Sequence, residues 1–355
     1  MPRVGTDGAI PHAARERQAV RRDPTIIDVA RLSGVSKSTV SNVIHGSAPV
    51  AAQTRARVEA AIEQLHYRPN GLARDLKRRH AATAGVLVGD LSNPFYAELT
   101  KLIERRIAGA GYVAIICDTD SDPAVERERI ELLLEQRVAG VLLTYFGGDE
   151  RTLQSVQRAG VPIVGVSVID RRFDSVASDD AAGARLAARH LAELGHRRIA
   201  YVRSPGTEAP TNRARLRGLR DVARAMGLTP GPVVTLDHPA RGAVLLSDVL
   251  AAREPPTAYV AGNDVTALAL IEQLESCGVP VPQAASVVGF DDIPLASYHR
   301  IALTTLRQPA TELADRAVER LLQRIGTAGE PPQRLQERLQ PTLITRGTTA
   351  PPPAR

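Results

Sequence analysis

The sequence predicts an α/β protein in which a small helical head precedes a long region built on parallel sheets. Short helical patterns and tight-turn signals fill residues 25–66. From residue 83 to residue 345, apolar strand-like runs alternate with amphipathic helical stretches, such as 84–90, 138–144, 197–203 and 285–291. This alternation is typical of parallel sheets that carry helices on both faces.

The charge distribution separates the two parts. Residues 1–80 contain 14 basic and 7 acidic side chains, whereas the remainder contains 31 basic and 32 acidic ones. The surplus predicts a polyanionic partner for the N-terminal end. Residues 1–24 read as a disordered basic tail, but the basic residues from Arg55 to Arg79 lie inside patterned structure, which a solvated tail explains less well.

Composition excludes several classes of protein. Cys117 and Cys277 are far apart and form no CxxC pattern, so neither a disulfide framework nor a metal site is expected. No secretory signal or membrane-spanning run occurs, which predicts a cytoplasmic protein without a membrane partner. No nucleophile elbow, zinc motif or phosphate loop is present, so we expect no enzyme activity, cofactor or catalytic residue.

The first two helices of the head have matching start and stop signals. Thr25 is a candidate cap for a first helix, and Gly34 permits a sharp turn after it. Ser36 is a candidate cap for a second helix, which Gly46 ends. The second helix turns Val40, Val43 and Ile44 inward. Two short helices at a tight turn indicate a helix-turn-helix.

The outward face of the second helix carries short or cationic side chains, which suit entry into the DNA major groove. Lys37, Ser38 and Asn42 are expected to reach base edges. Thr39 and Ser41 are better placed to bind phosphates. The alternative is an ordinary polar helix face.

A third helix, over Gln53–His66, and a short hinge segment complete the head. Arg55 lies in the first turn of the third helix, where its side chain is expected to contact the DNA phosphate backbone. Beyond Pro69, Leu76 lies between the basic residues Arg74 and Lys77, a pattern that suggests a minor-groove wedge which folds on binding. A flexible linker is the alternative. With the caps included, the predicted DNA-binding residues are Thr25, Ser36, Lys37, Ser38, Thr39, Ser41, Asn42, Arg55, Arg74, Leu76 and Lys77.

These residues resemble a known family. The runs DVARLSGVSKSTVS (28–41) and YRPNGLARDL (67–76) are similar to the head and hinge of the lactose-repressor (LacI/GalR) family of bacterial transcriptional regulators. The similarity continues in GVLVGDLSNPFYAEL (85–99), AARHLAELGHRRIAYV (187–202) and SVVGFDDIPLASY (286–298). It covers nearly the whole chain from Thr25 onward.

The resemblance implies the domain organisation. It predicts a DNA-binding domain at 25–68, a hinge helix at 69–80 and a periplasmic-binding-protein-like (type I) effector domain at 81–347. The effector domain would have two subdomains joined by three crossovers, and 348–355 would form a C-terminal tail. The absence of trailing leucine heptads favours a homodimer over a tetramer.

The resemblance also supplies candidate effector contacts. Phe95 and Tyr96 occupy positions that stack on a ring, and Arg215 and Asp264 occupy positions that usually hold polar groups of the ligand. An Arg–Asp pair beside an aromatic face suits a polyhydroxylated ligand such as a sugar, and the alternative is an inter-lobe salt bridge with core aromatics. Weaker candidates are Asn93, Asp118, Arg213 and Asn263.

Two positions depart from the family pattern and change the lining of the effector site. Asp237 stands where relatives often have an aromatic residue, and Ser167 stands where they often have an acid. Several strands also end in polar residues, including Asp90, Thr144 and Asp291, and ligands of open α/β sheets bind beyond such ends. Capping of the following helices is the alternative for these residues.

The predicted function is therefore an effector-controlled repressor that binds a palindromic operator as a homodimer, because two-fold protein symmetry calls for two-fold operator symmetry. One alternative is a solute-binding protein or a sugar-acting enzyme on the same fold. A second alternative, within regulation, is an activator or a repressor that needs a corepressor.

Overall fold

The chain divides into two compact units, residues 1–79 and residues 80–355. The computed structural model describes residues 24–45, 48–67, 83–203, 210–236, 246–327 and 333–354. In these ranges no helix is both long and apolar enough to cross a membrane. Gly46 and the predicted hinge at 69–80 lie outside the described residues.

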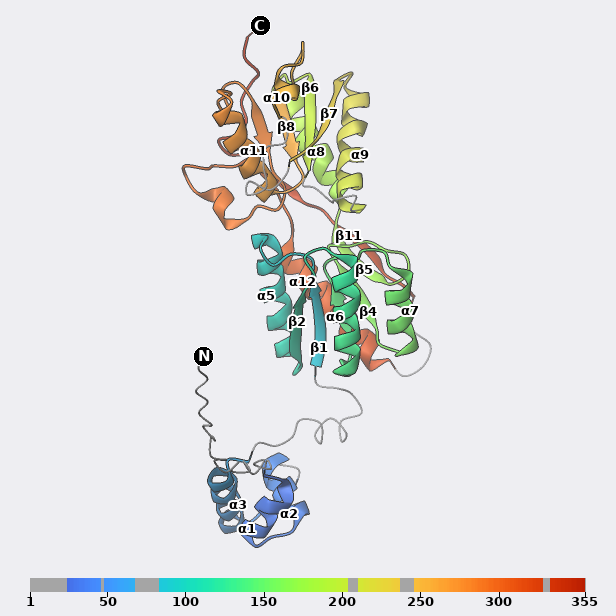
Figure 1. Cartoon of the computed structure of the whole chain (residues 1–355), viewed down its shortest axis with the longest axis vertical. Helices are drawn as coiled ribbons and strands as arrows, with labels where there is room; N and C mark the ends of the chain where they lie inside the picture. The colour runs from blue at the N-terminus through green and yellow to red at the C-terminus, as the bar shows by residue number, and fades with distance from the viewer. Residues whose placement is uncertain are drawn as a thin grey trace, which may run out of the picture. The chain divides into compact units, whose positions relative to one another are not determined.

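In the described residues of the first unit, three helices form a compact head (Figure 1). Its helices are α1 (Ile26–Ser33), α2 (Lys37–His45) and α3 (Ala52–Leu65). Gly34 ends α1 with φ 64°, a left-handed conformation that suits glycine and produces the predicted turn. The small core that holds the helices together consists of Val29, Val40, Val43, Val58 and Ala61.

The second unit contains two lobes, each built on a parallel sheet. The N-terminal lobe has the strand order β11-β5-β4-β3-β1-β2. Its strands are β1 (Thr83–Val88), β2 (Val113–Asp118), β3 (Val141–Leu143), β4 (Ile163–Val166), β5 (Asp174–Ser178) and β11 (Gln336–Leu339). Its helices are α5 (Pro94–Gly109), α6 (Pro123–Glu135), α7 (Glu150–Arg158) and α12 (Ala310–Gly326).

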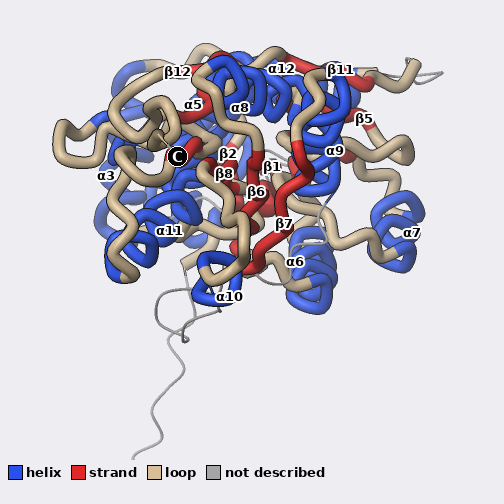
Figure 2. Tube along the Cα trace, turned by 90° about the horizontal axis from the view of Figure 1, so that it is seen from above, coloured by secondary structure: helices blue, strands red, loops and turns tan. Residues whose placement is uncertain are grey.

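The C-terminal lobe has the strand order β7-β6-β8-β9 (Figure 2). Its strands are β6 (Arg198–Arg203), β7 (Thr229–Thr235), β8 (Ala258–Ala261) and β9 (Ser286–Val288). Its helices are α8 (Asp180–Glu193), α9 (Pro210–Ala225), α10 (Leu246–Leu250), α11 (Asp264–Ser276) and the 3-10 helix η2 (Pro294–Ser297).

Three chain segments join the lobes, as the family resemblance implies. The first runs from β5 to α8, and the second from β10 (Thr305–Arg307) to α12. The third runs from β11 to β12 (Thr342–Ile344), and β10 and β12 pair antiparallel. The N-terminal lobe is therefore completed by α12 and β11, which begin at Ala310 and Gln336, far beyond the end of β5 at Ser178.

Ion pairs hold the returning helix α12 in place. Arg324 and Arg320 place their Nε atoms 2.5 and 3.0 Å from Oδ2 of Asp174 at the start of β5. Burial alone would raise the pKa of Asp174, but the hydrogen bonds from the two arginines outweigh it and lower the pKa. The apolar face of α12 packs inward in the same region, with Leu313, Ala317 and Leu321 buried.

The predicted boundary at residue 347 needs a correction. Thr348 donates from Oγ1 to the carbonyl of Val287 at 2.7 Å, and its own carbonyl accepts from the Val287 amide at 2.8 Å. His196 Nε2 lies 2.9 Å from the carbonyl of Ala350. The first residues of the expected tail therefore belong to the C-terminal lobe, because they satisfy hydrogen-bonding groups that β9 and the α8–β6 turn leave open.

Candidate DNA-reading helix and effector site

The two helix caps of the head form as the sequence predicts. Asp28 Oδ2 accepts from the Thr25 amide at 2.8 Å and from Thr25 Oγ1 at 2.6 Å, which completes a capping box around the start of α1. Ser36 Oγ accepts from the Thr39 amide at 3.1 Å and lies 2.8 Å from Thr39 Oγ1. Thr25 and Ser36 thus act within the head as caps, which fix where α1 and α2 begin.

The second helix presents the face that the sequence predicts for DNA contact. Lys37 and Ser38 are exposed, whereas Thr39, Ser41 and Asn42 are partly buried beside the core residues Val40 and Val43. A helix that packs its apolar residues into the core and carries short polar residues on its other face can approach base edges closely.

The remaining predicted DNA contacts lie on α3 and in the hinge. The Arg55 side chain, in the first turn of α3, is 42% exposed and lies 3.9 Å from Glu59, which makes a weak surface pair. Arg74, Leu76 and Lys77 lie outside the described residues.

The two lobes of the second unit share one group of polar residues, which we call the interlobe cluster: the buried Asn93, Asp180, Arg215, Asp291 and Gln308, and the partly buried Tyr96. Asn93 caps α5 by accepting from the Phe95 amide at 3.0 Å, and its side chain also bonds the carboxyl of Asp291 from the other lobe. Tyr96 lies within electrostatic range of Asp291 and Arg215, and burial raises the pKa of its hydroxyl. The start of α5 therefore meets the C-terminal lobe at this cluster.

Arg215 is the single cation of the cluster. Its Nε donates to Asp180 Oδ1 at 2.8 Å, and Nη1 donates to the carbonyl of Gly262. The guanidinium carbon lies 3.6 Å from the centre of the Phe290 ring, which stacks on its flat face. Burial opposes the charge of Arg215, but the carboxylates of Asp180 and Asp291 outweigh it and raise the pKa. The guanidinium stays charged at any accessible pH.

Asp291 is the second carboxyl near this cation. Gln308 Nε2 donates to Asp291 Oδ1 at 2.7 Å. Burial raises the pKa of Asp291, and the charges of Arg215 and the amide donors only partly offset this. Burial likewise raises the pKa of Asp180 despite its contact with Arg215. Two carboxyls therefore surround one guanidinium, and both hold protons more tightly than an exposed aspartate.

Several predicted effector residues hold loops rather than face the cluster. Asp264 is fully buried, and its carboxylate accepts from Thr305 Oγ1 at 2.5 Å and from the Ile293 amide at 2.9 Å. Asn263 caps α11 by accepting from the Thr266 amide at 2.7 Å. Asp118 accepts from the Leu91 and Asp120 amides, both at 3.1 Å. Capping, the alternative for polar residues at strand ends, is thus the role of Asn263. Asn93 also caps a helix, but it joins the cluster as well.

The other predicted effector residues have different placements. Phe95 is buried and packs edge-on against Tyr96, with ring centres 5.3 Å apart. Ser167 ends β4 with φ 62°, and its buried Oγ has no hydrogen-bond partner among the described residues. Arg213 is exposed on α9, and Asp237 lies outside the described residues.

Sequence reasoning did not select Asp180, Asp291 or Gln308 as effector contacts. A signal existed for Asp291, which was noted only as a polar residue at the end of a strand. Asp180 and Gln308 had no such signal, because each reaches the cluster through a crossover: Asp180 opens α8 after β5, and Gln308 follows β10. Residues so far apart in the chain meet only when both lobes are folded.

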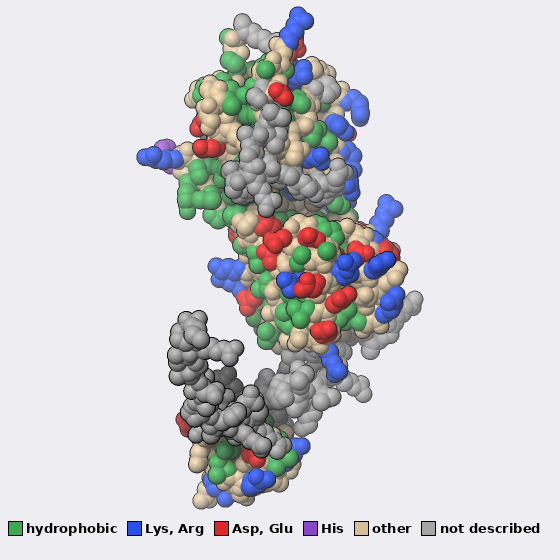
Figure 3. All heavy atoms as spheres, in the orientation of Figure 1, with side chains coloured by type: hydrophobic (Ala, Val, Ile, Leu, Met, Phe, Trp, Pro, Cys, Tyr) green, Lys and Arg blue, Asp and Glu red, His purple; other side chains and the backbone are tan. Residues whose placement is uncertain are grey.

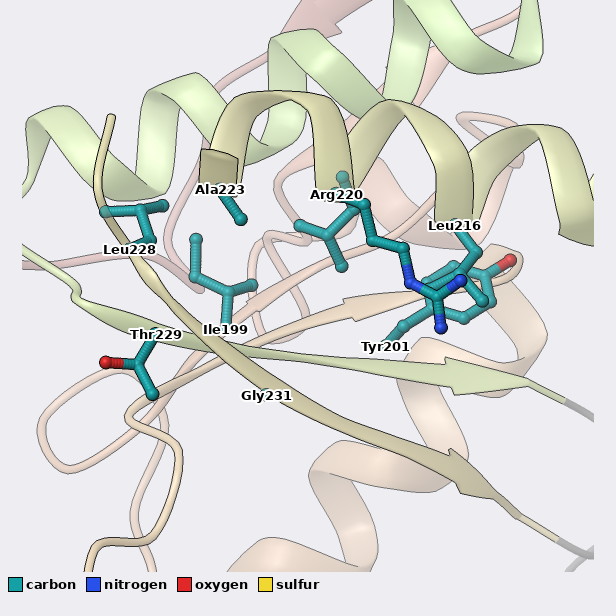
Figure 4. Close-up of a pocket in the computed structure, with 9 residues that line it drawn as sticks. Ile199, Tyr201, Leu216, Arg220, Ala223, Leu228, Thr229 and Gly231 are labelled. Atoms are coloured by element: carbon teal, nitrogen blue, oxygen red, sulfur yellow. The ribbon is translucent and has the colours of Figure 1, made fainter. Parts of the chain in front are cut away.

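A separate hollow of about 80 Å³ lies in the C-terminal lobe between α9 and strands β6 and β7 (Figure 4). Its lining is mainly apolar, with Ile199, Leu216, Ala223 and Leu228 facing the same space. No predicted effector residue and no member of the interlobe cluster lines it. This hollow therefore gives no reason to place the effector away from the interlobe cluster.

A DNA-reading head joined to a two-lobed unit with a polar cluster between its lobes defines a ligand-responsive DNA-binding regulator. Comparison with known proteins specifies the family. Residues 25–70 match the family described as bacterial regulatory proteins, lacI family, and residues 188–349 match the periplasmic binding protein-like domain.

Relatives of this chain are repressors. The ribose operon repressor of Escherichia coli (strain K12) is 37% identical over 330 residues, which cover 91% of this chain and 99% of that protein. The transcriptional repressor PurR of Photobacterium profundum is 34% identical over 331 residues, 91% of this chain and 97% of that protein. The chain belongs to the LacI family of bacterial transcriptional regulators.

Solved structures agree with this assignment. The lac repressor dimer bound to operator and the anti-inducer ONPF is 30% identical, with a TM-score of 0.77 over 93% of this chain and all of that one. A LacI-family regulator from Enterococcus faecium with bound ribose is 27% identical, with a TM-score of 0.65 over 76% of this chain and 99% of that one. The protein is thus an effector-controlled repressor that binds operator DNA, and the regulator interpretation is confirmed over the enzyme alternative.

Proposed function

We propose that the effector is a small polyhydroxylated sugar of the ribose type, held at the interlobe cluster. The observation that carries this proposal is the composition of the cluster: one guanidinium, two carboxyls and two amides, beside an aromatic residue. Hydroxyl groups donate to carboxylates and accept from guanidinium and amide groups, so a neutral polyol satisfies all of these partners.

Charge balance argues against an acidic effector. Arg215 already pairs with the carboxyl of Asp180, so an anionic ligand would bring a further negative charge into a buried cluster whose one cation is already paired. A sugar hydroxyl that donates to Asp291 instead stabilises the ionised carboxylate and brings no charge. Tyr96 supplies an apolar face for the ring carbons.

The solved relatives bind ligands of this kind. Besides the Enterococcus faecium regulator with bound ribose, solved structures similar to this chain include a regulator complexed with D-xylulofuranose and a cellobiose complex. At two sequence positions where relatives often have an acid and an aromatic residue, this chain has Ser167 and Asp237, so we expect selectivity among sugars rather than an identical ligand.

Calorimetric titration tests the proposal. The chain contains no tryptophan, so heat rather than tryptophan fluorescence is the signal. D-ribose, D-xylulose and cellobiose are titrated into the full chain, and one pentose is expected to bind. Arg215→Met should abolish this heat, whereas Arg217→Met, at an exposed position on the same helix, should leave it unchanged. Failure of all three sugars would remove the ribose-type assignment.

We further propose that the protein works as a homodimer through one side of the effector unit. Strand β2 is an edge strand, and its Val113 and Ile116 are 64% and 42% exposed. Leu295 and Tyr298, in and after η2, are 39% and 58% exposed, and apolar side chains gather on this projecting segment (Figure 3). An apolar unpaired edge strand invites pairing unless a partner covers it.

Sedimentation tests this surface. The wild type is expected to sediment as a dimer at micromolar concentration. Val113→Asp should shift it toward monomer, whereas Val233→Asp, at an exposed valine on the other edge strand β7, should not. A monomeric wild type would contradict the proposal.

On DNA, we propose that two heads read a palindrome and that Leu76 from each subunit wedges the central base step. The effector then shifts DNA affinity only by its difference in affinity between the two states of the protein. Selection of bound genomic fragments should return a pseudo-palindrome with a flexible pyrimidine–purine step at its centre. Leu76→Ala should weaken operator binding and leave sugar binding intact.

The same selected operator decides between the regulatory alternatives. If the sugar lowers operator affinity, the protein is an inducible repressor. If the sugar raises operator affinity, the sugar acts as a corepressor. Gene expression beside the operator should rise when the protein is absent, as expected of a repressor.

A further inference from the structure

Two consecutive aspartates after β9 adopt backbone conformations that non-glycine residues rarely show. Asp291 has φ 131° and Asp292 has φ 59°. Such conformations persist only where surrounding contacts impose them, and they gather at sites where a side chain must be aimed. Contacts with other residues must therefore hold the corner formed by residues 290–293 in a backbone conformation that aspartate rarely adopts.

The backbone of the corner is fixed from one side by Asp264. The Asp264 carboxylate accepts from the Ile293 amide at 2.9 Å and also from the Asp292 amide. The Asp264 amide in turn donates to the Phe290 carbonyl at 2.8 Å. Gly289 permits this close approach, because a Cβ there would lie 2.1 Å from Asp264 Oδ1.

The side chain of Asp292 fixes the corner from the other side. Its Oδ2 accepts from Arg307 Nε at 2.6 Å, and its Oδ1 accepts from Arg346 Nη2 at 2.6 Å. The carboxylate is almost fully buried, and the Arg346 side chain is 16% exposed. The Arg307 side chain is 58% exposed. Loss of the Asp292 carboxylate would therefore be felt mainly at Arg346, whose mostly buried guanidinium would lose this partner.

The two arginines belong to the two strands that cross between the lobes. Arg307 is the last residue of β10, and Arg346 follows β12 by two residues. Arg346 also contacts the segment that leads into β10, because its Nη1 donates to the Leu303 carbonyl at 2.8 Å. Asp291 is linked to the same strand, since its amide donates to the Leu306 carbonyl at 2.8 Å and Gln308 bonds its carboxyl.

We propose that Asp292 is a positioning residue of the effector site, which aims Asp291 into the interlobe cluster and ties that corner to both crossover strands. The part of this inference that concerns effector binding rests on the proposed function of the cluster. A ligand that hydrogen-bonds to the Asp291 carboxyl then acts on a turn whose next residue, Asp292, is ion-paired to Arg307 of β10 and to Arg346 after β12. The signal from the effector reaches the crossovers through one side chain.

Two substitutions of Asp292 distinguish the effect of its carboxylate from the effect of its backbone conformation. Asp292→Gly keeps the left-handed conformation without strain but removes the carboxylate. Asp292→Asn also tolerates this conformation and retains one oxygen that accepts from an arginine. If only the backbone turn matters, glycine is at least as good as aspartate. If the carboxylate matters, glycine fails and asparagine restores part of the function.

Two readouts on the full chain test the proposal. Hydrogen exchange without any sugar should accelerate in residues 303–308 and 342–347 for Asp292→Gly, less for Asp292→Asn, and not in α8 or α9. Titration with D-ribose should show affinity reduced by about tenfold for Asp292→Gly, with partial recovery for Asp292→Asn. Asp315→Asn, which removes charge from a two-contact ion pair with Arg106 between α12 and α5, is the matched control and should alter neither readout.

Unchanged exchange in both crossover segments of Asp292→Gly would overturn the proposal. Faster exchange spread evenly over the C-terminal lobe would also overturn it, because Asp292 would then be a general stabiliser. If the wild type binds no D-ribose, the proposed effector class fails, while the exchange comparison still decides whether Asp292 holds the crossovers. If exchange accelerates only in the crossover segments and ribose affinity is unaltered, Asp292 holds the crossovers but does not orient Asp291 for ligand binding.

Discussion

Replacement of Arg215 by methionine is expected to destabilise the effector unit strongly and in a pH-dependent way. Methionine preserves most of the side-chain length but removes the cation that faces Asp180 and Asp291. The Arg215 and Asp180 side chains are only 10% and 9% exposed, so water cannot replace the lost partner. The variant removes the guanidinium that lowers the pKa of both carboxyls and leaves Asp180 only the weaker influence of Arg338.

The magnitude follows from the burial of the pair. Removing one partner of a buried ion pair costs about 3–5 kcal/mol of unfolding free energy. For a unit of this size that corresponds to a fall in melting temperature of roughly 6–10 °C. Asp180→Asn combined with Arg215→Met should recover about half of the loss, since one uncompensated carboxylate disappears with the cation.

The pH dependence separates charge from packing. Arg215 lowers the pKa values of Asp180 and Asp291, so its loss raises both further. A carboxyl whose folded-state pKa is raised binds more protons when folded, so its penalty is absent below about pH 4 and grows as the pH increases. Thermal unfolding of wild type and variant at pH 4 and pH 7.5 measures this. An equal loss at both values would refute the charge argument and assign the effect to the lost stacking on Phe290.

Three further predictions concern other parts of the chain. Burial raises the pKa of Glu126 to about 7, so its stability contribution should decline from pH 4 to pH 7, and Glu126→Gln should flatten this profile in urea unfolding and stabilise the protein at pH 8 by up to about 4 kcal/mol. Gly218→Ala places a Cβ 2.2 Å from the Ala181 carbonyl oxygen between α9 and α8, and calorimetry should show a loss of about 1–3 kcal/mol or more. Lys37→Ala should weaken binding to the selected operator by about 1–3 kcal/mol at fixed salt and relax the sequence preference at one base position, whereas an equal loss on random DNA would reassign Lys37 to a phosphate.

The local structure of the head could be predicted in detail because its signals are local. Thr25, Gly34 and Ser36 act on the residues next to them, and the core of Val29, Val40, Val43 and Val58 follows from helical spacing. The seven apolar runs from 84–90 to 285–291 likewise became parallel strands. Strands β5, β7 and β10–β12 were not singled out by the sequence pattern, because each is short, polar or broken by proline and glycine.

The effector site required the tertiary structure. The family resemblance implied a site that includes Asn93, Tyr96 and Arg215, and the structure brings these three together. Asp264 does not join them, because its carboxylate accepts hydrogen bonds from the Ile293 amide and the Thr305 hydroxyl. Asp291 takes the place beside Arg215 that the sequence analysis expected of Asp264.

The sequence by itself determined the class of this protein, because the helix-turn-helix head and the alternation of strands and helices depend on residues close together in the chain. Only the tertiary structure decided which carboxyls face Arg215. Asp180, Asp291 and Gln308 arrive from three different chain segments, two of which lie at crossovers between the lobes. Their proximity, their burial and the resulting pKa shifts depend on how the two lobes close on one another, and no local pattern encodes that.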